Sequence, residues 1–191
     1  MIAKIVKGIL RYPYWFIKEF IALMNLRICN PTCYIARRTF LNIDKVSFCE
    51  FGQEVSIGNF TTIHIRNYCK NKNNSKLIIG DNTYIGEFNN IRASGAEITI
   101  GKNCLISQHV SIIGSNHNYD KGSNIEEQGW DETKNFIQIG DDVWVGANTV
   151  ILPGVKIGDG AIVGAGSVVT KDVKPFDIVV GHAAKVLKHR E

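Results

Sequence analysis

A six-residue repeat runs from Ile139 to Lys174 and constrains the fold more than any other feature of this sequence. Aliphatic residues occupy one phase of the repeat, and small or β-branched residues follow four places after each of them. The two sets are Ile139, Val145, Ile151, Ile157, Val163 and Val169, and Val143, Thr149, Val155, Ala161, Ser167 and Val173. Because side chains alternate across a strand, a period of six keeps each set on one face at every rung. The repeat predicts a parallel β-solenoid over roughly residues 40–175, with the first set pointing inward.

The same phase occurs earlier in three shorter blocks, and each block ends where the repeat is interrupted. The aliphatic positions are Phe51, Ile57 and Ile63; Ile79, Ile85 and Ile91; and Ile100, Ile106 and Ile112. The interruptions are a polar run from Arg66 to Lys76, a small shift around Gly95, and a long polar segment between Ile112 and Ile139. We expect a loop insertion at about residues 114–137. Long insertions into regular repeats usually carry function.

Composition narrows the class of protein. A chain of 191 residues with 45% hydrophobic residues and 18 glycines is one domain with a narrow core, and a net charge of +4 gives little support for nucleic-acid binding. Cysteines are odd in number and form no Cys-x-x-Cys pair: Cys29, Cys33, Cys49, Cys69 and Cys104. We interpret them as reduced thiols of a cytoplasmic protein.

Residues 1–34 have helical instead of strand spacing. Apolar residues recur on one helical face before Pro13 and again after it, which predicts two short amphipathic helices. Lys18 and Glu19 interrupt the apolar stretch, so a membrane span is not expected. The segment either caps the open end of the solenoid or lies on an anionic membrane surface, and we favour the cap.

The run from Ile139-Gly140-Asp141-Asp142-Val143-Trp144 to Val168-Val169-Thr170-Lys171 resembles the hexapeptide-repeat acyltransferase superfamily, in its galactoside, maltose and polysaccharide O-acetyltransferase branch. The resemblance covers about residues 35–190 and is most specific in this run. It implies an all-β fold, the left-handed parallel β-helix, over residues 35–191, with a C-terminal tail at 175–191. It also implies a homotrimer that binds acetyl-CoA between neighbouring subunits, with no metal.

His117 is the candidate catalytic residue. A sugar hydroxyl is a poor nucleophile, so acetyl transfer needs a general base, and histidine suits this role near neutral pH. His117 lies in Ser115-Asn116-His117-Asn118, where the repeat gives way to the insertion, and this resembles the place of the family's catalytic histidine. Acids of the insertion include Asp120, Glu126, Glu127 and Asp131, but none of them is marked as the partner that orients His117. No residue is marked as a covalent nucleophile; Cys104, the nearest candidate thiol, is expected to be buried and inert.

The resemblance also implies substrate and cofactor contacts. Asn89 resembles the family's acceptor-binding asparagine, with Asn90 as a substitute, and Trp144 is expected to contact the acceptor or the pantetheine arm. Predicted cofactor contacts are Trp144, Ala147, Ala165, Thr170, Lys171, Lys185 and Lys188, with the N–H of Ala147 as a donor to the thioester oxygen. The family usually has a proline in the segment Gly181-His182-Ala183-Ala184, and its absence here puts the path of the tail, and so Lys185 and Lys188, in question.

These observations predict an acetyl-CoA-dependent O-acetyltransferase that acts by direct transfer on a sugar, namely a unit of a surface polysaccharide. Three alternatives stay open. The first alternative is an amino-sugar N-acetyltransferase. The second is a zinc enzyme of the same fold, similar to a carbonic anhydrase, that uses His64, His109 and His117. The third is a non-catalytic scaffold. Bound metal would identify the zinc enzyme, and CoA binding would exclude the scaffold.

Overall fold

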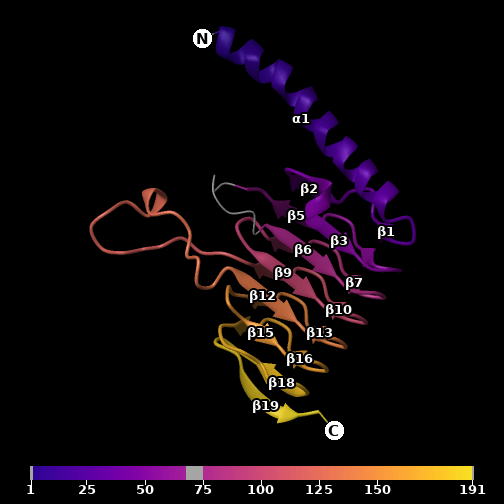
Figure 1. Cartoon of the computed structure of the whole chain (residues 1–191), viewed down its shortest axis with the longest axis vertical. Helices are drawn as coiled ribbons and strands as arrows, with labels where there is room; N and C mark the ends of the chain where they lie inside the picture. The colour runs from indigo at the N-terminus through magenta and orange to yellow at the C-terminus, as the bar shows by residue number, and fades with distance from the viewer. Residues whose placement is uncertain (1, 68–74, 191) are drawn as a thin grey trace.

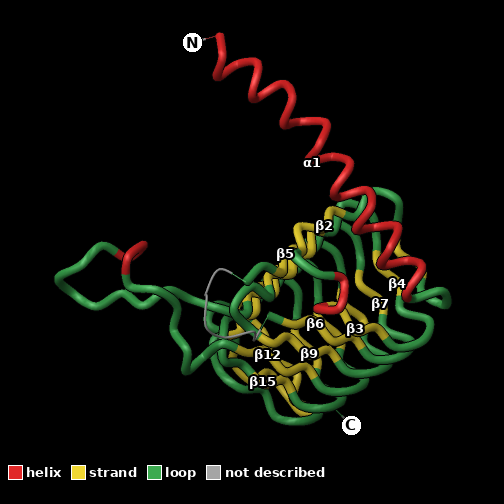
Figure 2. The backbone as a smooth tube through the Cα atoms, turned by 45° about the horizontal axis from the view of Figure 1, so that its top comes forward, coloured by secondary structure: helices red, strands yellow, loops and turns green. Residues whose placement is uncertain are grey.

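The computed structural model describes residues 2–67 and 75–190, and in the N-terminal helix it describes side chains from residue 16 onward. Cys69 and most of the polar run between Arg66 and Lys76 lie outside the described residues. The chain coils around a single axis, with α1 at one end and the C-terminal strands at the other (Figure 1). Three sheets form the sides of the coil, and viewed closer to its axis the stacked turns enclose a narrow interior (Figure 2).

Each complete turn of the coil contributes one strand to each sheet. The first sheet contains β1 (Tyr34–Ile35), β4 (Ser56–Ile57), β7 (Tyr84–Ile85), β10 (Leu105–Ile106), β13 (Trp144–Val145), β16 (Ile162–Val163), β18 (Asp177–Val180) and β19 (Lys185–His189). The second sheet contains β2 (Phe40–Ile43), β5 (Thr62–Ile65), β8 (Asn90–Arg92), β11 (Ser111–Ile113), β14 (Val150–Ile151) and β17 (Val168–Val169). The third sheet contains β3 (Cys49–Phe51), β6 (Lys76–Ile79), β9 (Glu97–Ile100), β12 (Phe136–Ile139) and β15 (Lys156–Ile157). We call the turns from the first to the second sheet the first corner, those from the second to the third sheet the second corner, and those that return to the first sheet the third corner.

The strands pair in parallel, except for β18 with β19, and the predicted left-handed parallel β-helix is confirmed. All six aliphatic residues of the repeat point inward and are at most 2% exposed: Ile139, Val145, Ile151, Ile157, Val163 and Val169. The small and β-branched set is also buried, because it fills the tight interior of the corners. The repeat thus stacks into one continuous core.

The third corner explains why Gly-Asp recurs in the sequence. The Asp81, Asp141 and Asp159 carboxylates each accept a hydrogen bond from a backbone N–H of the preceding turn of the coil, at 2.7–2.8 Å. A Cβ on Gly140 would lie 2.1 Å from Oδ1 of Asp159, so no side chain fits there. Three turns of the coil are therefore each held by an aspartate carboxylate of the next turn.

The N-terminal segment differs from the prediction of two helices. It forms one helix, α1 (Ile2–Cys29), which continues through Pro13. Proline removes one backbone hydrogen bond from a helix interior, and the many remaining bonds of so long a helix keep it continuous. Only the end of the helix packs on the coil, where Leu23 and Leu26 are buried in the core. Arg27 donates to the carbonyl of Ile35 and fixes this end, whereas the rest of α1 projects away from the coil (Figure 1).

The described chain contains no helix with both the length and the hydropathy needed to cross a membrane.

The C-terminal tail also differs from the prediction. After the turn at Pro175 and Phe176, β18 joins the first sheet beside β16, so the solenoid continues to Val180. The β19 strand then folds back antiparallel to β18. The six-residue phase is lost at Pro175, but Asp177 and Val179 are still buried in alternation, which is enough to place the strand.

Candidate active site

His117 lies at the base of the insertion, which leaves the second corner after β11 and returns at β12. It pairs with Trp130 as an isolated antiparallel bridge, and the two rings stack with centroids 4.6 Å apart. Two backbone hydrogen bonds flank this bridge. The N–H of Asp131 donates to the carbonyl of Asn116, and the N–H of Asn118 donates to the carbonyl of Gly129. The outgoing and returning chains therefore hold an exposed imidazole against an indole. Trp130 was not singled out in the sequence, and its only signal was an aromatic residue close to the return of the insertion.

The four acids considered as partners of His117, Asp120, Glu126, Glu127 and Asp131, have other partners or remain in solvent. Asp131 accepts hydrogen bonds from the hydroxyl and the backbone N–H of Thr133. Both bonds lower the pKa of its carboxyl group, and the bond from the hydroxyl has the larger effect. Glu127 accepts from the Asn124 amide, and Glu126 lies in the short helix η2 (Ile125–Glu127). Among the described residues, none of these carboxylates or that of Asp120 hydrogen-bonds to His117. None of these four carboxylates therefore orients His117.

The first corner contains the residues predicted to line the pantetheine channel. Ala147 and Ala165 follow β13 and β16 in consecutive turns, and Gly166 N–H donates to the Ala147 carbonyl. Within the described chain, the N–H groups of Ala147 and Ala165 themselves donate no hydrogen bond. Trp144 lies beside them on β13, is 50% exposed, and donates from Nε1 to the Ser107 hydroxyl at 3.4 Å. This corner thus offers unused backbone donors next to an exposed indole.

A line of paired residues leads from Trp144 to the C-terminal end of the coil. Trp144 pairs with Ile162, Ile162 with Ile178, and Ile178 with Lys188 on β19. Paired residues on adjacent strands share a face, so the four lie in one column on the outside of the first sheet. Three strand spacings make this column about 14 Å long. Lys185, also exposed, pairs with Val180 at the end of β18.

Thr170 and Lys171 are exposed but lie elsewhere. They follow β17 at the second corner, the same corner that carries the insertion two turns earlier. The predicted site residues thus fall on two corners of one chain. His117, Thr170 and Lys171 are at the second corner, and Trp144, Ala147, Ala165 and Lys188 are at or near the first.

Asn89 is not placed to contact an acceptor. It is 2% exposed, its Nδ2 donates to the Gly86 carbonyl at 3.0 Å, and its Oδ1 accepts from Val110 N–H at 2.6 Å. The side chain therefore stabilises the first corner from inside. Asn90, suggested as its substitute, is half-buried on the outer face of β8, and Glu87 and Phe88 are the exposed residues of this turn.

The three histidines proposed as zinc ligands do not form a cluster within one chain. His109 has a φ of 58° at the first corner and stacks on Phe88, 5.0 Å between centroids. His64 lies on the outside of the second sheet opposite Arg92. Burial, and then the Arg92 and Arg66 charges, lower the pKa of His64. The described residues contain no group of three His, Cys, Asp or Glu side chains placed to hold a metal.

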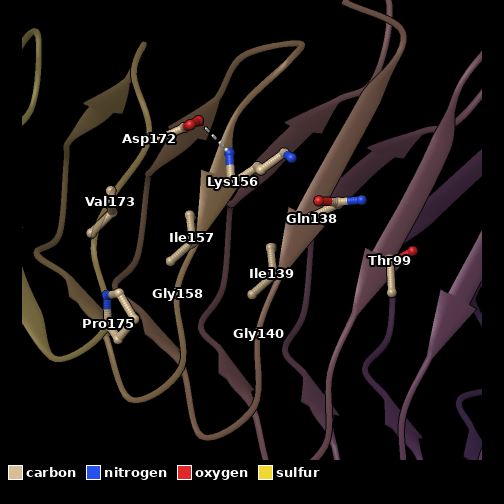
Figure 3. A pocket seen from close by; sticks show the side chains of 10 residues that line it. All are labelled: Thr99, Gln138, Ile139, Gly140, Lys156, Ile157, Gly158, Asp172, Val173 and Pro175. Carbon is tan, nitrogen blue, oxygen red and sulfur yellow. Dashed lines mark hydrogen bonds between the residues drawn. The ribbon is translucent and has the colours of Figure 1, made fainter.

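A groove of about 460 Å³ lies outside the third sheet and contains none of the predicted site residues (Figure 3). Gln138 and Lys156 project along it, and Asp172 accepts a hydrogen bond from the Lys156 backbone N–H at 2.8 Å. The residues that line this groove include no histidine, and they form no row of unused backbone N–H groups. It is separate from the candidate active site.

Cys104, the thiol expected to be inert, is buried. Its Sγ lies 3.0 Å from the Gly140 carbonyl, and burial raises the pKa of the thiol. A thiol in this state is a poor nucleophile. The structure therefore agrees with the absence of a covalent route through Cys104.

The repeated coil and the insertion at its second corner define a hexapeptide-repeat transferase, and residues 136–171 match the family model described as bacterial transferase hexapeptide (six repeats). Hexapeptide-repeat-containing acetyltransferase from Vibrio cholerae, complexed with acetyl coenzyme A, is 30% identical with a TM-score of 0.62, over 75% of this chain and 72% of that chain. The chain belongs to the hexapeptide-repeat acetyltransferases.

Two further comparisons extend this result. A probable macrolide acetyltransferase of Lysinibacillus sphaericus is 41% identical over 111 residues, which are 50% of this chain and 62% of that protein. AntD, an N-acyltransferase from Bacillus cereus in complex with dTDP and coenzyme A, has the same fold, with a TM-score of 0.71 and 20% identity over 88% of this chain and 89% of that chain. The chain spans 56–62% of the length of three curated acetyltransferases that it matches.

Proposed function

We propose that the protein is an acetyl-CoA-dependent O-acetyltransferase in which His117 is the general base. The observation that carries this proposal is the exposed His117 ring, held against Trp130 at the base of the insertion. A neutral imidazole in this position removes the proton of a hydroxyl as it attacks. The acceptor we propose is a sugar hydroxyl, such as that of a surface polysaccharide unit.

Acetyl-CoA fits the column that ends at Lys188. The unused N–H groups of Ala147 and Ala165 suit the amide oxygens of pantetheine and the thioester oxygen, and Trp144 offers an apolar surface beside them. About 14 Å further along, Lys188 provides a cation for the phosphates. We assign Lys171 and Lys185 to the same cofactor, Lys171 from the second corner of a neighbouring copy.

The division of the site between two corners supports a homotrimer. His117 and Trp144 lie at different corners of one chain, so a cleft that contains both forms where the second corner of one copy meets the first corner of the next. The outer face of the first sheet is apolar enough for such a contact: Tyr34, Tyr84, Leu105 and Trp144 are between 39 and 64% exposed.

The reaction we propose is direct. His117 accepts the hydroxyl proton while the oxygen attacks the thioester carbonyl. The Ala147 N–H donates to the oxyanion of the tetrahedral intermediate, which collapses with loss of the CoA thiolate, and the protonated His117 returns a proton to the thiolate. No covalent acetyl-enzyme is needed. Free thiols at Cys29 and Cys33 fit a reducing compartment, so we place this reaction in the cytoplasm.

The decisive experiment measures thiol release from acetyl-CoA with a panel of oligosaccharides, an activated sugar, an amino sugar and a macrolide. We expect acceptor-dependent release with a hydroxyl acceptor. Turnover should fall by about 10²- to 10⁴-fold in His117→Ala, with little change in either Michaelis constant. The matched control is His109→Ala, whose ring stacks on Phe88 at the first corner and whose loss should change turnover far less. Full activity in His117→Ala would refute the mechanism, and transfer only to the amino sugar would reassign the protein as an N-acetyltransferase.

A further inference from the structure

One exposed face of α1 is apolar over its described length. Phe16, Ile17, Phe20, Ile21 and Ile28 are between 51 and 74% exposed. Leu23 and Leu26 attach the helix to the coil and are buried, and Leu23 lies on the same face as Phe16 and Phe20, three residues after Phe20. The exposed apolar stripe therefore continues beyond the coil the face with which the helix packs on it.

The opposite face of the helix is cationic. Phe16 and Phe20 are a turn apart, and Lys18 lies half a turn from each, so its exposed side chain projects from the opposite face. The whole helix sequence contains Lys4, Lys7, Arg11, Lys18 and Arg27 but only one acid, Glu19. Glu19 is half-buried, and burial raises the pKa of its carboxyl group. The helix thus combines an apolar face with a strong excess of positive charge.

A groove at the foot of the helix has the same combination. It has a volume of about 310 Å³ and lies between α1 and the first turns of the coil, where Phe16, Phe20 and Phe40 line it. Arg37 and Arg38 also line this groove and are exposed. The lining also includes the half-buried Glu19, but its aromatic side chains and two exposed guanidinium groups suit an acyl chain with a phosphate headgroup.

We propose that α1 lies in the plane of an anionic lipid bilayer and attaches the protein peripherally to it. Several observations favour a membrane over a second protein as the occupant. Most of α1 projects beyond the coil (Figure 1), its exposed apolar stripe has no partner within the described chain, and its charge complements anionic headgroups. A helix with this pattern buries its apolar face at the boundary between headgroups and acyl chains. The attachment goes beyond the proposed acetyl transfer and does not depend on it.

The test is co-sedimentation of the full-length protein with vesicles of phosphatidylcholine alone, and of phosphatidylcholine mixed with phosphatidylglycerol. We expect binding to the mixed vesicles only, and weaker binding as salt concentration rises. Lys18→Glu changes the local charge by two units, so it should weaken binding about 25-fold, at roughly fivefold per unit charge near the surface. Lys174→Glu makes the same change on an exposed lysine at the opposite end of the coil and should bind as the wild type does.

A second pair of variants tests the apolar face. The double variant Phe16→Asn and Phe20→Asn should lose binding, whereas Ile125→Asn, on an exposed residue of the insertion, should keep it. Light scattering and the thermal midpoint check that assembly and folding are unchanged. Equal binding to both vesicle types, or equal loss in Lys18→Glu and Lys174→Glu, would overturn the proposal. A smaller particle mass for the double phenylalanine variant would overturn it too, because the stripe would then be a contact between copies.

Discussion

The imidazole of His117 and the indole of Trp130 stack at 4.6 Å between centroids, and their backbones pair across the base of the insertion. Stacking of this kind contributes about 0.5–1.5 kcal/mol. We therefore expect Trp130→Ala to lower turnover about 3- to 10-fold through a less fixed His117, and Trp130→Phe to restore it. Tyr119→Ala, at an 80% exposed position of the same insertion, is the control. Steady-state kinetics with a fixed acceptor measure this effect, and failure of Phe to rescue would argue against a positioning role.

Lys188 and Lys171 are predicted to contact the cofactor from different corners. Loss of one charge-assisted contact costs about 1.5 kcal/mol, so Lys188→Ala and Lys171→Ala should each raise the Michaelis constant for acetyl-CoA roughly tenfold with turnover nearly unchanged. Lys174→Ala, at an exposed position of the third corner, should leave the constant as it is. An unaltered constant for either of the first two variants would place that lysine in bulk solvent.

Asn89 is expected to matter for stability and not for the acceptor. Asn89→Ala leaves the buried Val110 N–H without an acceptor, which should lower the free energy of unfolding by about 1–3 kcal/mol in a denaturant titration. Asn90→Ala, on the outer face of β8, should change it by less than about 0.5 kcal/mol. A higher Michaelis constant for the acceptor at full stability in Asn89→Ala would restore the acceptor contact expected from the sequence.

Cysteine reactivity should divide by burial. Burial raises the pKa of the Cys49 thiol to about 12, and it also raises that of Cys104, whereas Cys29 is exposed. In a Cys69→Ser background, iodoacetamide at pH about 8 should modify Cys29 within minutes and the two buried thiols only after denaturant is added, because thiolate is the reactive form. Peptide mass spectrometry reads the sites. Since the raised pKa of Cys49 favours the protonated folded form, its contribution to stability should be lost as pH rises from 9.0 toward about 12.

The sequence was sufficient to predict the coil because its repeat is local and each rung makes the same contacts. The six aliphatic residues from Ile139 to Val169 point into one core from the three sheets, and no distant residue changes which face they occupy. The N-terminal segment was predicted wrongly at Pro13, where the intrinsic cost of proline in a helix did not outweigh the remaining helical hydrogen bonds. Local helix propensity alone does not show whether the remaining hydrogen bonds outweigh the cost of the proline.

The candidate site was less predictable because its contacts are not local. His117 was found from its position where the repeat ends, but its stacking on Trp130 depends on how the insertion returns. An asparagine at the position of Asn89 can point its amide outward or inward, and the sequence does not distinguish the two. The hydrogen bonds of the folded corner determine that the amide is buried. Lys188 joins the column of Trp144 only because β19 folds back onto β18, which the lost six-residue phase did not indicate.

The separation of His117 and Trp144 onto different corners has a consequence for how such a protein loses activity. In the homotrimer proposed above, each reaction centre is shared between two copies, so dilution of the protein below the dissociation constant of the trimer should abolish activity in every chain while leaving its fold intact. A chain without His117 and a chain without the first-corner contacts are each inert alone, yet a mixed particle regains a complete centre wherever an intact half of one meets an intact half of the other. Genetic complementation between two inactive alleles is therefore the natural signature of this architecture.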